Sequence, residues 1–242
     1  MKYFVTFAVK KVQMYKDLFI DLDRTLWDFE TNASETLKEI YVYHQIQIES
    51  NHAFEYFIHT YRQVNSDLWD LYRLGEITKA YLSVERFRKT MELLNQDESK
   101  AQLMAKQYIT WSAQKKKLFP GVIGTLEYLK EKYRMHIVTN GFNEVQFKKI
   151  KNSGLSPFFD TIITSDNAGY KKPDQAFFNY AFRKTSATPK STLTIGDDEK
   201  SDIEGAKLAG TDQVFVNYDN RKLPGLNPTY EVNAFYELKK IL

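Results

Sequence analysis

A segment near the start of the chain reads Leu18-Phe19-Ile20-Asp21-Leu22-Asp23-Arg24-Thr25. Its apolar run predicts a short buried strand, and the polar residues that follow would lie at the carboxyl end of that strand. Because side chains two apart on a strand point the same way, Asp21 and Asp23 would share one face. Two such acids can act as nucleophile and general acid or base, or they can share a divalent cation, although an Asp-x-Asp pair also begins many turns and helices.

Three later segments also place polar residues where a strand or loop ends. They are Thr139-Asn140-Gly141 after the apolar run 135–138, Gly169-Tyr170-Lys171-Lys172-Pro173-Asp174, which is expected to open a helix with Pro173 at its first turn, and Gly196-Asp197 through Asp202 after the run 192–195. In a parallel α/β sheet the carboxyl ends of the strands border one crevice, so these segments are expected to converge there. An acid pair, a hydroxyl with neighbouring amides, a lysine and a second acid cluster are the groups of a phosphate and metal site.

The order and spacing of these segments resemble the four motifs of the haloacid dehalogenase (HAD) superfamily, and the resemblance covers residues 15–242. Within the superfamily the chain is similar to the house-cleaning pyrimidine 5′-nucleotidases. The matching residues are Val64-Asn65-x-x-Leu68-Trp69-x-x-Tyr72-x-x-Gly75-x-Ile77-Thr78, Arg86-Phe87, Thr139-Asn140-Gly141-Phe142 and Pro228-Thr229-Tyr230-x-Val232. The resemblance implies an α/β fold, with a Rossmann-like parallel sheet core and an inserted all-helical cap domain.

Glycine and proline usage divides the chain. Residues 30–119 contain no proline and a single glycine, Gly75, whereas both residue types recur after Pro120. Within this stretch apolar residues recur at helical spacing: Leu37, Ile40 and Tyr41; Val84, Phe87, Met91 and Leu94; Met104, Tyr108 and Trp111. We therefore predict a helical cap over residues 31–115 and a core formed by residues 14–30 and 116–242, with strands near 135–139, 160–164, 192–196 and 213–217. Residues 1–13 are predicted to be a peripheral extension, with an extra strand as the alternative.

The composition is typical of a soluble enzyme, with 43% hydrophobic residues, a formal net charge of +3 and no cysteine. No apolar run approaches the roughly 20 residues that a transmembrane helix needs, so we expect no membrane partner. The basic run 115–117 lacks interleaved aromatic residues, which favours a solvated segment over a nucleic-acid contact. A cytoplasmic monomer or homodimer is predicted. The histidines show neither ligand spacing nor an Asp partner; they are His44, His52, His59 and His136.

The resemblance implies roles for the acids. Asp21 would attack phosphorus to form an aspartyl-phosphate, and Asp23 would protonate the leaving oxygen and later deprotonate water. Mg²⁺ is the expected cofactor because all candidate ligands are oxygens. The expected ligands are the side chains of Asp21 and Asp197, the main-chain carbonyl of Asp23, and Asp202, directly or through water. Asp198 and Glu199 are competing candidates, which as acids at a helix start also have a structural explanation.

A charge argument calls for a lysine as well. A phosphomonoester dianion beside Asp21 and Asp197 carries more negative charge than one Mg²⁺ offsets. We expect Lys172 to supply the additional positive charge, because it directly precedes Pro173 as in the superfamily pattern. Its neighbour Lys171 is predicted to be solvated.

Two further predictions concern the phosphate group and one unusual position. Thr139 would donate its hydroxyl, and Asn140 its backbone N–H, to phosphoryl oxygens. Arg24 stands where many relatives carry Gly, Asp or Glu. If the strand continues, Arg24 faces away from the acid pair, so we assign it to the boundary between cap and core.

Specificity is expected to come from the cap segment that runs from Asn65 to Arg86. Trp69 and Tyr72 lie three residues apart, so they would share one face of a helix that Gly75 ends. Either aromatic could stack on a flat base, with Asn65 or Arg86 at its polar edge. The alternative is that both aromatics only pack the interior of the cap.

The function predicted from the sequence is that of a Mg²⁺-dependent phosphomonoester hydrolase acting on pyrimidine nucleoside 5′-monophosphates. Alternatives within the enzyme class are a small sugar-phosphate or phosphoglycolate phosphatase, or a phosphomutase. A carbon–halogen hydrolase is disfavoured, because that reaction would require neither Asp23 nor the later acid cluster. From a different class, the chain could be a catalytically silent phosphate-binding or regulatory module, although the intact set of acids, Thr139 and Lys172 argues against silence.

Overall fold

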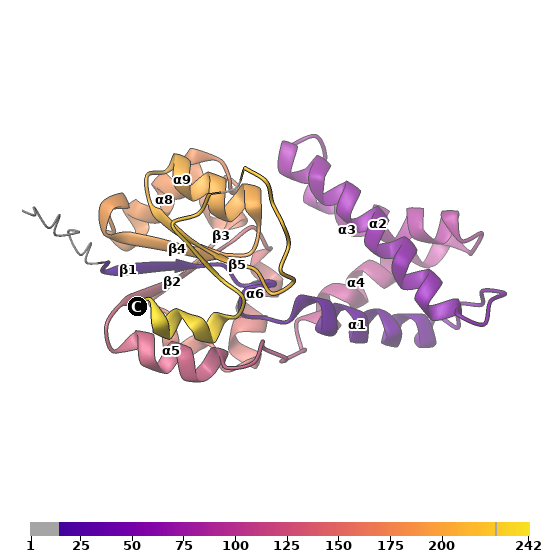
Figure 1. The fold of residues 1–242 in the computed structure, drawn as a ribbon. Helices are drawn as coiled ribbons and strands as arrows, with labels where there is room; N and C mark the ends of the chain where they lie inside the picture. Colours follow the sequence, from indigo (N-terminus) through magenta and orange to yellow (C-terminus); the bar gives the residue numbers. More distant parts are fainter. Residues whose placement is uncertain (1–14, 226) are drawn as a thin grey trace, which may run out of the picture.

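The computed structural model describes residues 15–225 and 227–242, so the prediction for residues 1–13 lies outside the described residues. A parallel sheet with the strand order β3-β2-β1-β4-β5-β6 forms the centre of the core (Figure 1). Its strands are β1 (Asp17–Ile20), β2 (Arg134–Thr139), β3 (Thr161–Thr164), β4 (Thr192–Gly196), β5 (Asp212–Val216) and β6 (Tyr230–Val232). The expected α/β class and the strands β1 to β5 are confirmed. β6 was not expected, because its three residues carry no apolar run.

Helices cover both faces of this sheet, which explains why its central strands are continuous apolar runs. Leu18 and Ile20 of β1 face α5 (Val122–Lys130), α6 (Asn143–Asn152) and the 3₁₀ helix η5 (Phe235–Lys240). Phe19, between them, faces the other side, where α7 (Ser165–Ala168), α8 (Gln175–Thr185) and α9 (Gly205–Leu208) pack. The shorter turns are η1 (Glu98–Lys100), η2 (Ser156–Phe158), η3 (Pro189–Ser191) and the π-helical η4 (Glu199–Glu204).

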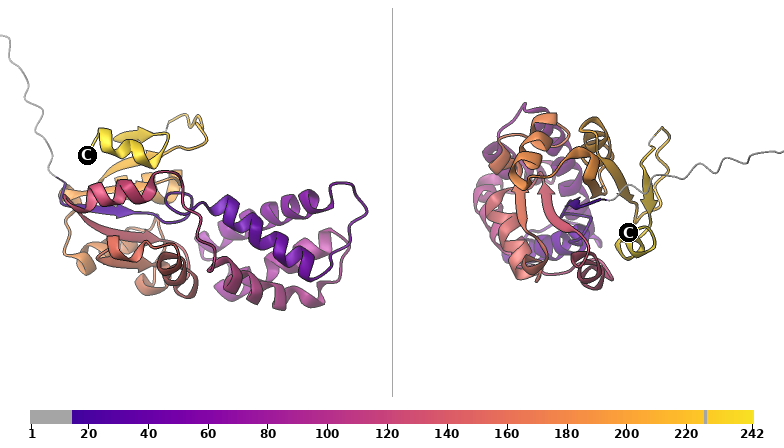
Figure 2. Two further views of the ribbon diagram at one scale, coloured as in Figure 1. Left: turned by 90° about the horizontal axis from the view of Figure 1, so that it is seen from below. Right: turned by 90° about the vertical axis from the view of Figure 1, so that its left-hand side faces the viewer.

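A separate group of helices follows β1 and lies beyond the carboxyl ends of the strands (Figures 1 and 2). It consists of α1 (Phe29–Tyr43), α2 (Ala53–Leu74), α3 (Lys79–Leu93) and α4 (Ala101–Ser112). The apolar residues predicted at helical spacing all lie in, or pack against, one hydrophobic cluster shared by these helices. Gly75 ends α2 with a φ of +78°, a conformation that glycine adopts without strain.

Two connecting segments join the helices to the core, and Asn32 holds them together. Its side-chain amide donates to the carbonyls of Asp28 and Lys117, both at 2.8 Å, and its oxygen accepts from the Lys117 N–H. The sites where the chain leaves and re-enters the core are therefore paired, and residues 31–115 remain our proposal for the cap. No helix in the described ranges has both the length and the apolar character needed to cross a membrane.

Candidate active site

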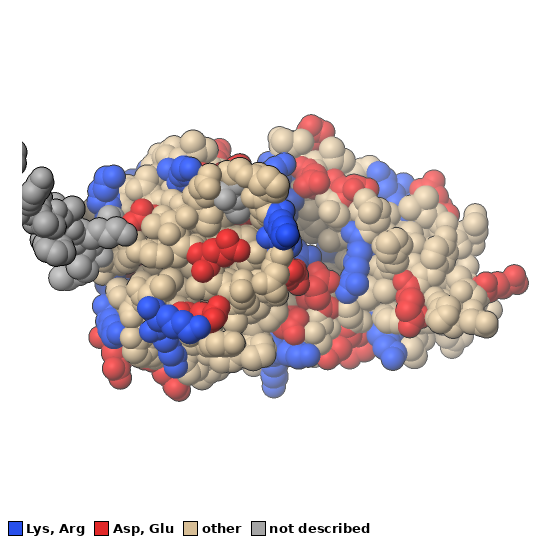
Figure 3. All heavy atoms as spheres, in the orientation of Figure 1, with Lys and Arg blue, Asp and Glu red and all other residues tan. Residues whose placement is uncertain are grey.

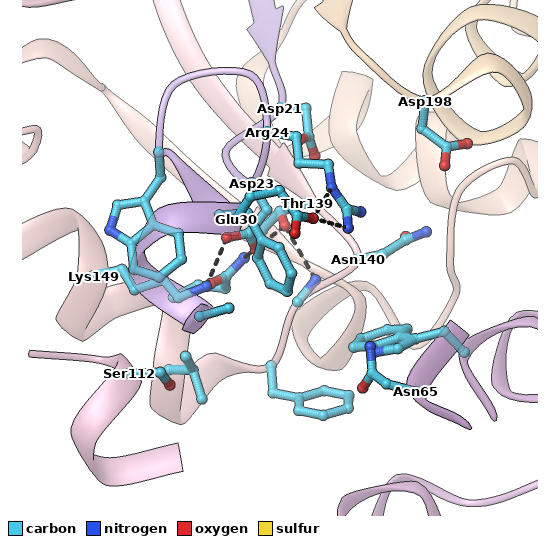
Figure 4. Close-up of a pocket in the computed structure, with 18 of the residues that line it drawn as sticks. Asp21, Asp23, Arg24, Glu30, Asn65, Ser112, Thr139, Asn140, Lys149 and Asp198 are labelled. Carbon is cyan, nitrogen blue, oxygen red and sulfur yellow. Dashed lines mark hydrogen bonds and ion pairs between the residues drawn. The ribbon is translucent and has the colours of Figure 1, made fainter. Parts of the chain in front are cut away.

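A cavity of about 290 Å³ lies between the carboxyl ends of the strands and the helices α1 to α4. Figure 3 shows side chains of both charge signs around this hollow, and Figure 4 shows the residues that line it. The four polar segments predicted to converge all contribute to its wall. The lining includes Asp21, Asp23, Asn65, Trp69, Arg86, Thr139, Asn140, Lys172, Asp197 and Asp202.

Lys172 is the centre of a buried group that we call the acid–lysine cluster, formed with Asp21, Asp197 and Asp202. Its side chain is only 1% exposed, and its Nζ donates to Asp21 Oδ1 at 2.8 Å, to Asp202 Oδ1 at 2.5 Å and to the Val138 carbonyl at 2.8 Å. Burial lowers the pKa of Lys172, but the two carboxylates raise it more, so the ammonium form is favoured. The lysine is thus a fixed positive charge beside the candidate nucleophile.

Asn140 fixes the backbone of Lys172 with its side chain. Its Nδ2 donates to the Lys172 carbonyl at 2.9 Å, and its Oδ1 accepts from the Lys172 N–H at 2.8 Å. The sequence predicted only a backbone N–H contact to phosphate for Asn140, and that contact stays a prediction. The neighbouring Lys171 is not simply solvated, because its Nζ donates to the Tyr72 carbonyl at 2.7 Å and lies 3.9 Å from the centre of the Tyr72 ring.

The acid–lysine cluster has more negative than positive charge. Asp21, Asp197 and Asp202 each offer an oxygen, and these oxygens lie within 4.8 Å of one another, with Lys172 as their ammonium partner. Burial raises the pKa of Asp21, which Lys172 opposes. Burial and the nearby Asp202 raise the pKa of Asp197 to about 7. Three clustered carboxylates, two of them buried, with this excess of negative charge fit a hard divalent cation such as Mg²⁺.

Asp198, one of the competing acids, has a structural partner instead. Asp198 accepts a hydrogen bond from the Ser201 N–H at 2.8 Å, and so caps the turn that carries Asp202. Asp202 accepts from the Asp198 N–H through Oδ2 while its Oδ1 faces Lys172, so the same carboxylate also fixes the lysine. A Cβ at Gly196 would collide with the Asp202 side chain, which explains why glycine precedes Asp197.

Asp23 is held by two residues that the sequence analysis missed. Its Oδ1 accepts from Lys149 Nζ at 2.6 Å, and its Oδ2 accepts from Gln146 Nε2 at 2.8 Å. Lys149 is 4% exposed, and its Nζ lies 3.9 Å from the centre of the Trp27 ring (Figure 4). The sequence feature that could have identified these two residues is the i, i+3 spacing of Gln146 and Lys149 on the helix that follows Thr139. This spacing places both side chains on one face of the helix.

Thr139 is oriented by the same helix. Its Oγ1 accepts from Gln146 Nε2 at 2.9 Å and from the Gly141 N–H at 3.1 Å. Across the part of the chain that the structure describes, no protein acceptor is recorded for the Thr139 hydroxyl hydrogen. The hydroxyl can therefore donate into the cavity, as the phosphate-binding prediction requires.

Arg24 lines the cavity, which corrects the expectation that it faces away from the acid pair. The strand ends at Ile20 and Arg24 has a φ of +63°, so the alternation of a strand does not apply there. Its guanidinium donates to Glu30 Oε1 at 2.6 Å and lies 4.6 Å from the centre of the Phe29 ring. Because Glu30 and Phe29 begin α1, Arg24 does connect the core to the helices, as predicted.

The candidate specificity residues divide into two groups. Asn65, Trp69 and Arg86 line the cavity. Tyr72 does not, which agrees with the alternative that it is a packing residue: it is 7% exposed and packs edge-on against Trp69 and Phe142, with ring centres 5.5 and 5.6 Å apart. The Trp69 ring is stacked on Phe142, which follows the Thr139 segment. These aromatics therefore hold α2 against the core.

One histidine has an acidic partner that the sequence did not suggest. His136 Nε2 lies 3.2 Å from Asp17 Oδ1, and Arg134 lies 2.7 Å from the same oxygen. Both Asp17 and His136 are almost fully buried. Asp17 begins β1, so this group sits at the opposite end of the strand from Asp21.

Several known proteins are similar to this chain over almost its whole length. YfnB of Bacillus subtilis strain 168, a HAD-hydrolase, is 29% identical over 233 residues, which cover 96% of this chain and 97% of YfnB. Its magnesium-bound crystal structure matches with a TM-score of 0.86 and 30% identity, covering 95% of this chain and 99% of that one.

Two relatives have more specific names. The pyrimidine 5′-nucleotidase YjjG of Escherichia coli K12 is 29% identical over 227 residues, covering 93% of this chain and 96% of YjjG. The glyceraldehyde 3-phosphate phosphatase of Methanothermobacter thermautotrophicus is 28% identical over 245 residues, covering 95% of this chain and all of that protein.

The family model for a haloacid dehalogenase-like hydrolase matches residues 15–210. This range includes β1 to β4, the helices inserted after β1 and the whole acid–lysine cluster, and on that basis the chain belongs to the haloacid dehalogenase-like hydrolases.

Proposed function

We propose that this chain is a Mg²⁺-dependent phosphatase that hydrolyses pyrimidine nucleoside 5′-monophosphates through an aspartyl-phosphate. The phosphatase activity is proposed on the basis of the acid–lysine cluster, in which Lys172 Nζ lies 2.8 Å from Asp21 Oδ1. Thr139 lines the same cavity. A nucleophile, a fixed cation and a donor for phosphoryl oxygens thus border one space.

In the first half-reaction an oxygen of Asp21 attacks phosphorus. A new bond forms between that oxygen and phosphorus while the ester bond breaks, and the leaving oxygen takes a proton from Asp23. Lys172 and the Thr139 hydroxyl would bind the phosphoryl oxygens. Mg²⁺, held by Asp21, Asp197 and Asp202 with the Asp23 carbonyl as the further candidate, would offset negative charge on the carboxylates and the phosphoryl group.

In the second half-reaction Asp23 removes a proton from water, which attacks the aspartyl-phosphate and restores Asp21. Both oxygens of Asp23 accept hydrogen bonds from α6 in the structure. Acting as an acid therefore requires Asp23 to exchange at least one of these contacts for the substrate. Lys149 and Gln146 would hold Asp23 in place between turnovers.

The pyrimidine part of the proposal is supported by the cavity and by two relatives. The pyrimidine 5′-nucleotidases YjjG and PynA of Streptococcus pneumoniae R6 each match more than nine-tenths of this chain. The cavity, at about 290 Å³, is at the small end of ligand sites, which run from roughly 300 to 1,000 Å³. Aromatic side chains on its walls, including Trp27 and Trp69, suit a flat ring.

A panel of phosphomonoesters with added Mg²⁺ tests this function. We expect kcat/KM for UMP, dUMP or TMP to exceed that for AMP, GMP and phosphoglycolate by at least about tenfold, which needs only about 1.4 kcal/mol of differential transition-state binding. If glyceraldehyde 3-phosphate or another sugar phosphate is the best substrate, the nucleotidase proposal is wrong and the phosphatase proposal stands. Isomerised product without phosphate release would indicate a phosphomutase, and binding without turnover would indicate a silent phosphate-binding module.

A further inference from the structure

Arg86 differs from the other cations on the cavity wall. Six lysine and arginine side chains line the cavity, and five of them have a carboxylate within 4.0 Å: Arg24, Arg62, Arg73, Lys149 and Lys172. Among the described residues, Arg86 has no such partner. It is nevertheless only 5% exposed. A buried charge without a counter-charge is unfavourable, so this guanidinium is open to an acceptor that the protein does not provide.

The surroundings of Arg86 leave specific donors free. Its NH1 donates to Asn65 Oδ1 at 3.4 Å, which is long for a hydrogen bond, and its guanidinium carbon lies 4.5 Å from the centre of the Tyr108 ring. Within the described ranges, neither Arg86 Nε nor the Tyr61 hydroxyl has a hydrogen-bond partner, although both atoms are buried. Tyr61 also lines the cavity. The two unpartnered groups therefore belong to the wall of the cavity that the helices form.

This wall and the catalytic acids act on the same space. Asp21, Asp23, Arg86 and Tyr108 all line the one cavity. A substrate bound with its phosphate at Asp21 would therefore share this cavity with the Arg86 guanidinium.

The lining favours a neutral, flat group over a second anion at this position. Aromatic rings surround the space between the acids and Arg86; they are Trp27, Phe29, Tyr61, Trp69, Tyr108 and Phe142. A planar ring can stack between such side chains, and the planar guanidinium fork suits carbonyl oxygens on the edge of that ring. Uracil and thymine carry an oxygen at position 4. Cytosine carries an amino group there, which would oppose one donor with another.

We propose that Arg86, supported by Tyr61, is the specificity-determining group that binds the carbonyl oxygen at position 4 of the substrate base, and that it thereby selects 2,4-dioxopyrimidine nucleotides over cytosine nucleotides. This inference rests on the proposed nucleotidase function. It adds the residues that bind the base and the group of the base, a carbonyl oxygen, that they bind.

The test compares dUMP with dCMP in the wild type, in Arg86→Lys and in a matched control, Arg88→Lys. We expect the wild type to prefer dUMP by at least about tenfold in kcat/KM. Arg86→Lys keeps the charge but loses the fork, so kcat/KM for dUMP should fall at least about tenfold, mainly through KM, and the preference should nearly disappear. Arg88 lies on the same helix but pairs with Glu85, Glu92 and Glu98, so Arg88→Lys should keep the wild-type preference.

Tyr61→Phe is a second variant, in case Arg86→Lys fails to fold. It removes only the unpartnered hydroxyl and should reduce the dUMP preference by about threefold or more. A wild type that hydrolyses dUMP and dCMP equally well would overturn this inference and leave the nucleotidase intact. The same conclusion follows if neither variant changes the preference. If phosphoglycolate is the best substrate and loses most in Arg86→Lys, the guanidinium binds a carboxylate, and both proposals are wrong.

Discussion

Arg86 on the helical wall of the cavity differs from the lysines on the core wall, although Arg62 and Arg73 of α2 do pair with carboxylates. On the core wall, Lys172 faces Asp21 and Asp202, and Lys149 faces Asp23, all within 2.8 Å. On the helical wall, Arg86 is buried, and no acidic side chain in the described part of the chain pairs with it. Under the proposed function, the groups that carry out the chemistry are thus held in place by one another before a substrate arrives, whereas the group proposed to recognise the substrate has open donors. The first arrangement gives preorganisation and the second gives selectivity.

The strongest way to break this comparison is to remove the nucleophile from the core wall. Asp21→Asn keeps the shape of the side chain but abolishes nucleophilic attack, so kcat should fall by at least about a thousandfold on every substrate. Excess EDTA should have a comparable effect on the wild type. A melting temperature close to that of the wild type would show that the fold is retained. Steady turnover by a verified Asp21→Asn sample, or full activity in EDTA, would contradict the mechanism.

Asp23→Asn should produce a loss that depends on the leaving group. The variant cannot protonate the leaving oxygen, so a nucleotide should slow about a hundredfold more than p-nitrophenyl phosphate, whose phenolate leaves with little help. The comparison of kcat/KM for the two substrates measures this difference. Equal losses would exclude a dominant leaving-group role. Burst kinetics would then show whether slow hydrolysis of the aspartyl-phosphate hides the difference.

Part of the core wall could be predicted from the sequence because three of its groups end or directly follow a strand, whereas Lys149 on α6 was missed. Asp21 follows β1, Thr139 ends β2 and Asp197 follows β4, and parallel strands bring those ends to one edge. No alignment of distant segments was needed to place them. Arg24 shows the limit of that reasoning, since a single residue with positive φ ended the alternation on which its predicted direction relied.

The helical wall could not be predicted in the same way. Tyr61, Arg86 and Tyr108 come from α2, α3 and α4, and only the packing of three helices places them together. Their spacing in the sequence is that of ordinary core residues. Tyr72 illustrates the converse: it shares a helical face with Trp69 as predicted, but it packs against Phe142 and does not line the cavity.

Lys149→Met tests whether the helix α6 matters for the core wall. Methionine can keep the contact with Trp27 but cannot donate to Asp23, and Gln146 alone would then orient that carboxylate. We expect kcat to fall by about 10- to 100-fold, the usual range for a misplaced catalytic group. Lys148→Met, at an exposed position on the same helix, serves as the control and should behave as the wild type. Similar rates for both variants would remove Lys149 from the positioning role.

The smallest expected effect concerns how Mg²⁺ stabilises the core wall at different pH values. The pKa of Asp197 is raised from 3.8 to about 7 by burial and by Asp202, so the metal-free folded protein binds more protons than the unfolded chain between those values. Its stability should therefore increase as pH falls through 7, because ionising Asp197 in the folded state is unfavourable. Mg²⁺ binds the ionised form of the Asp197 carboxylate. At pH 6 the cation must first displace a proton from Asp197, whereas at pH 8 this proton is largely absent.

The increase in melting temperature caused by Mg²⁺ should thus be larger at pH 8 than at pH 6, by about 2–4 °C. Burial lowers the pKa of His136, which reduces stability below pH 6.5. That contribution is the same with and without the metal, because His136 lies at the opposite end of the sheet, so it cancels in the difference. Asp197→Asn should weaken the stabilisation by Mg²⁺ and remove most of its pH dependence. A shift that is equal at both pH values in the wild type would mean that Asp197 does not bind the cation.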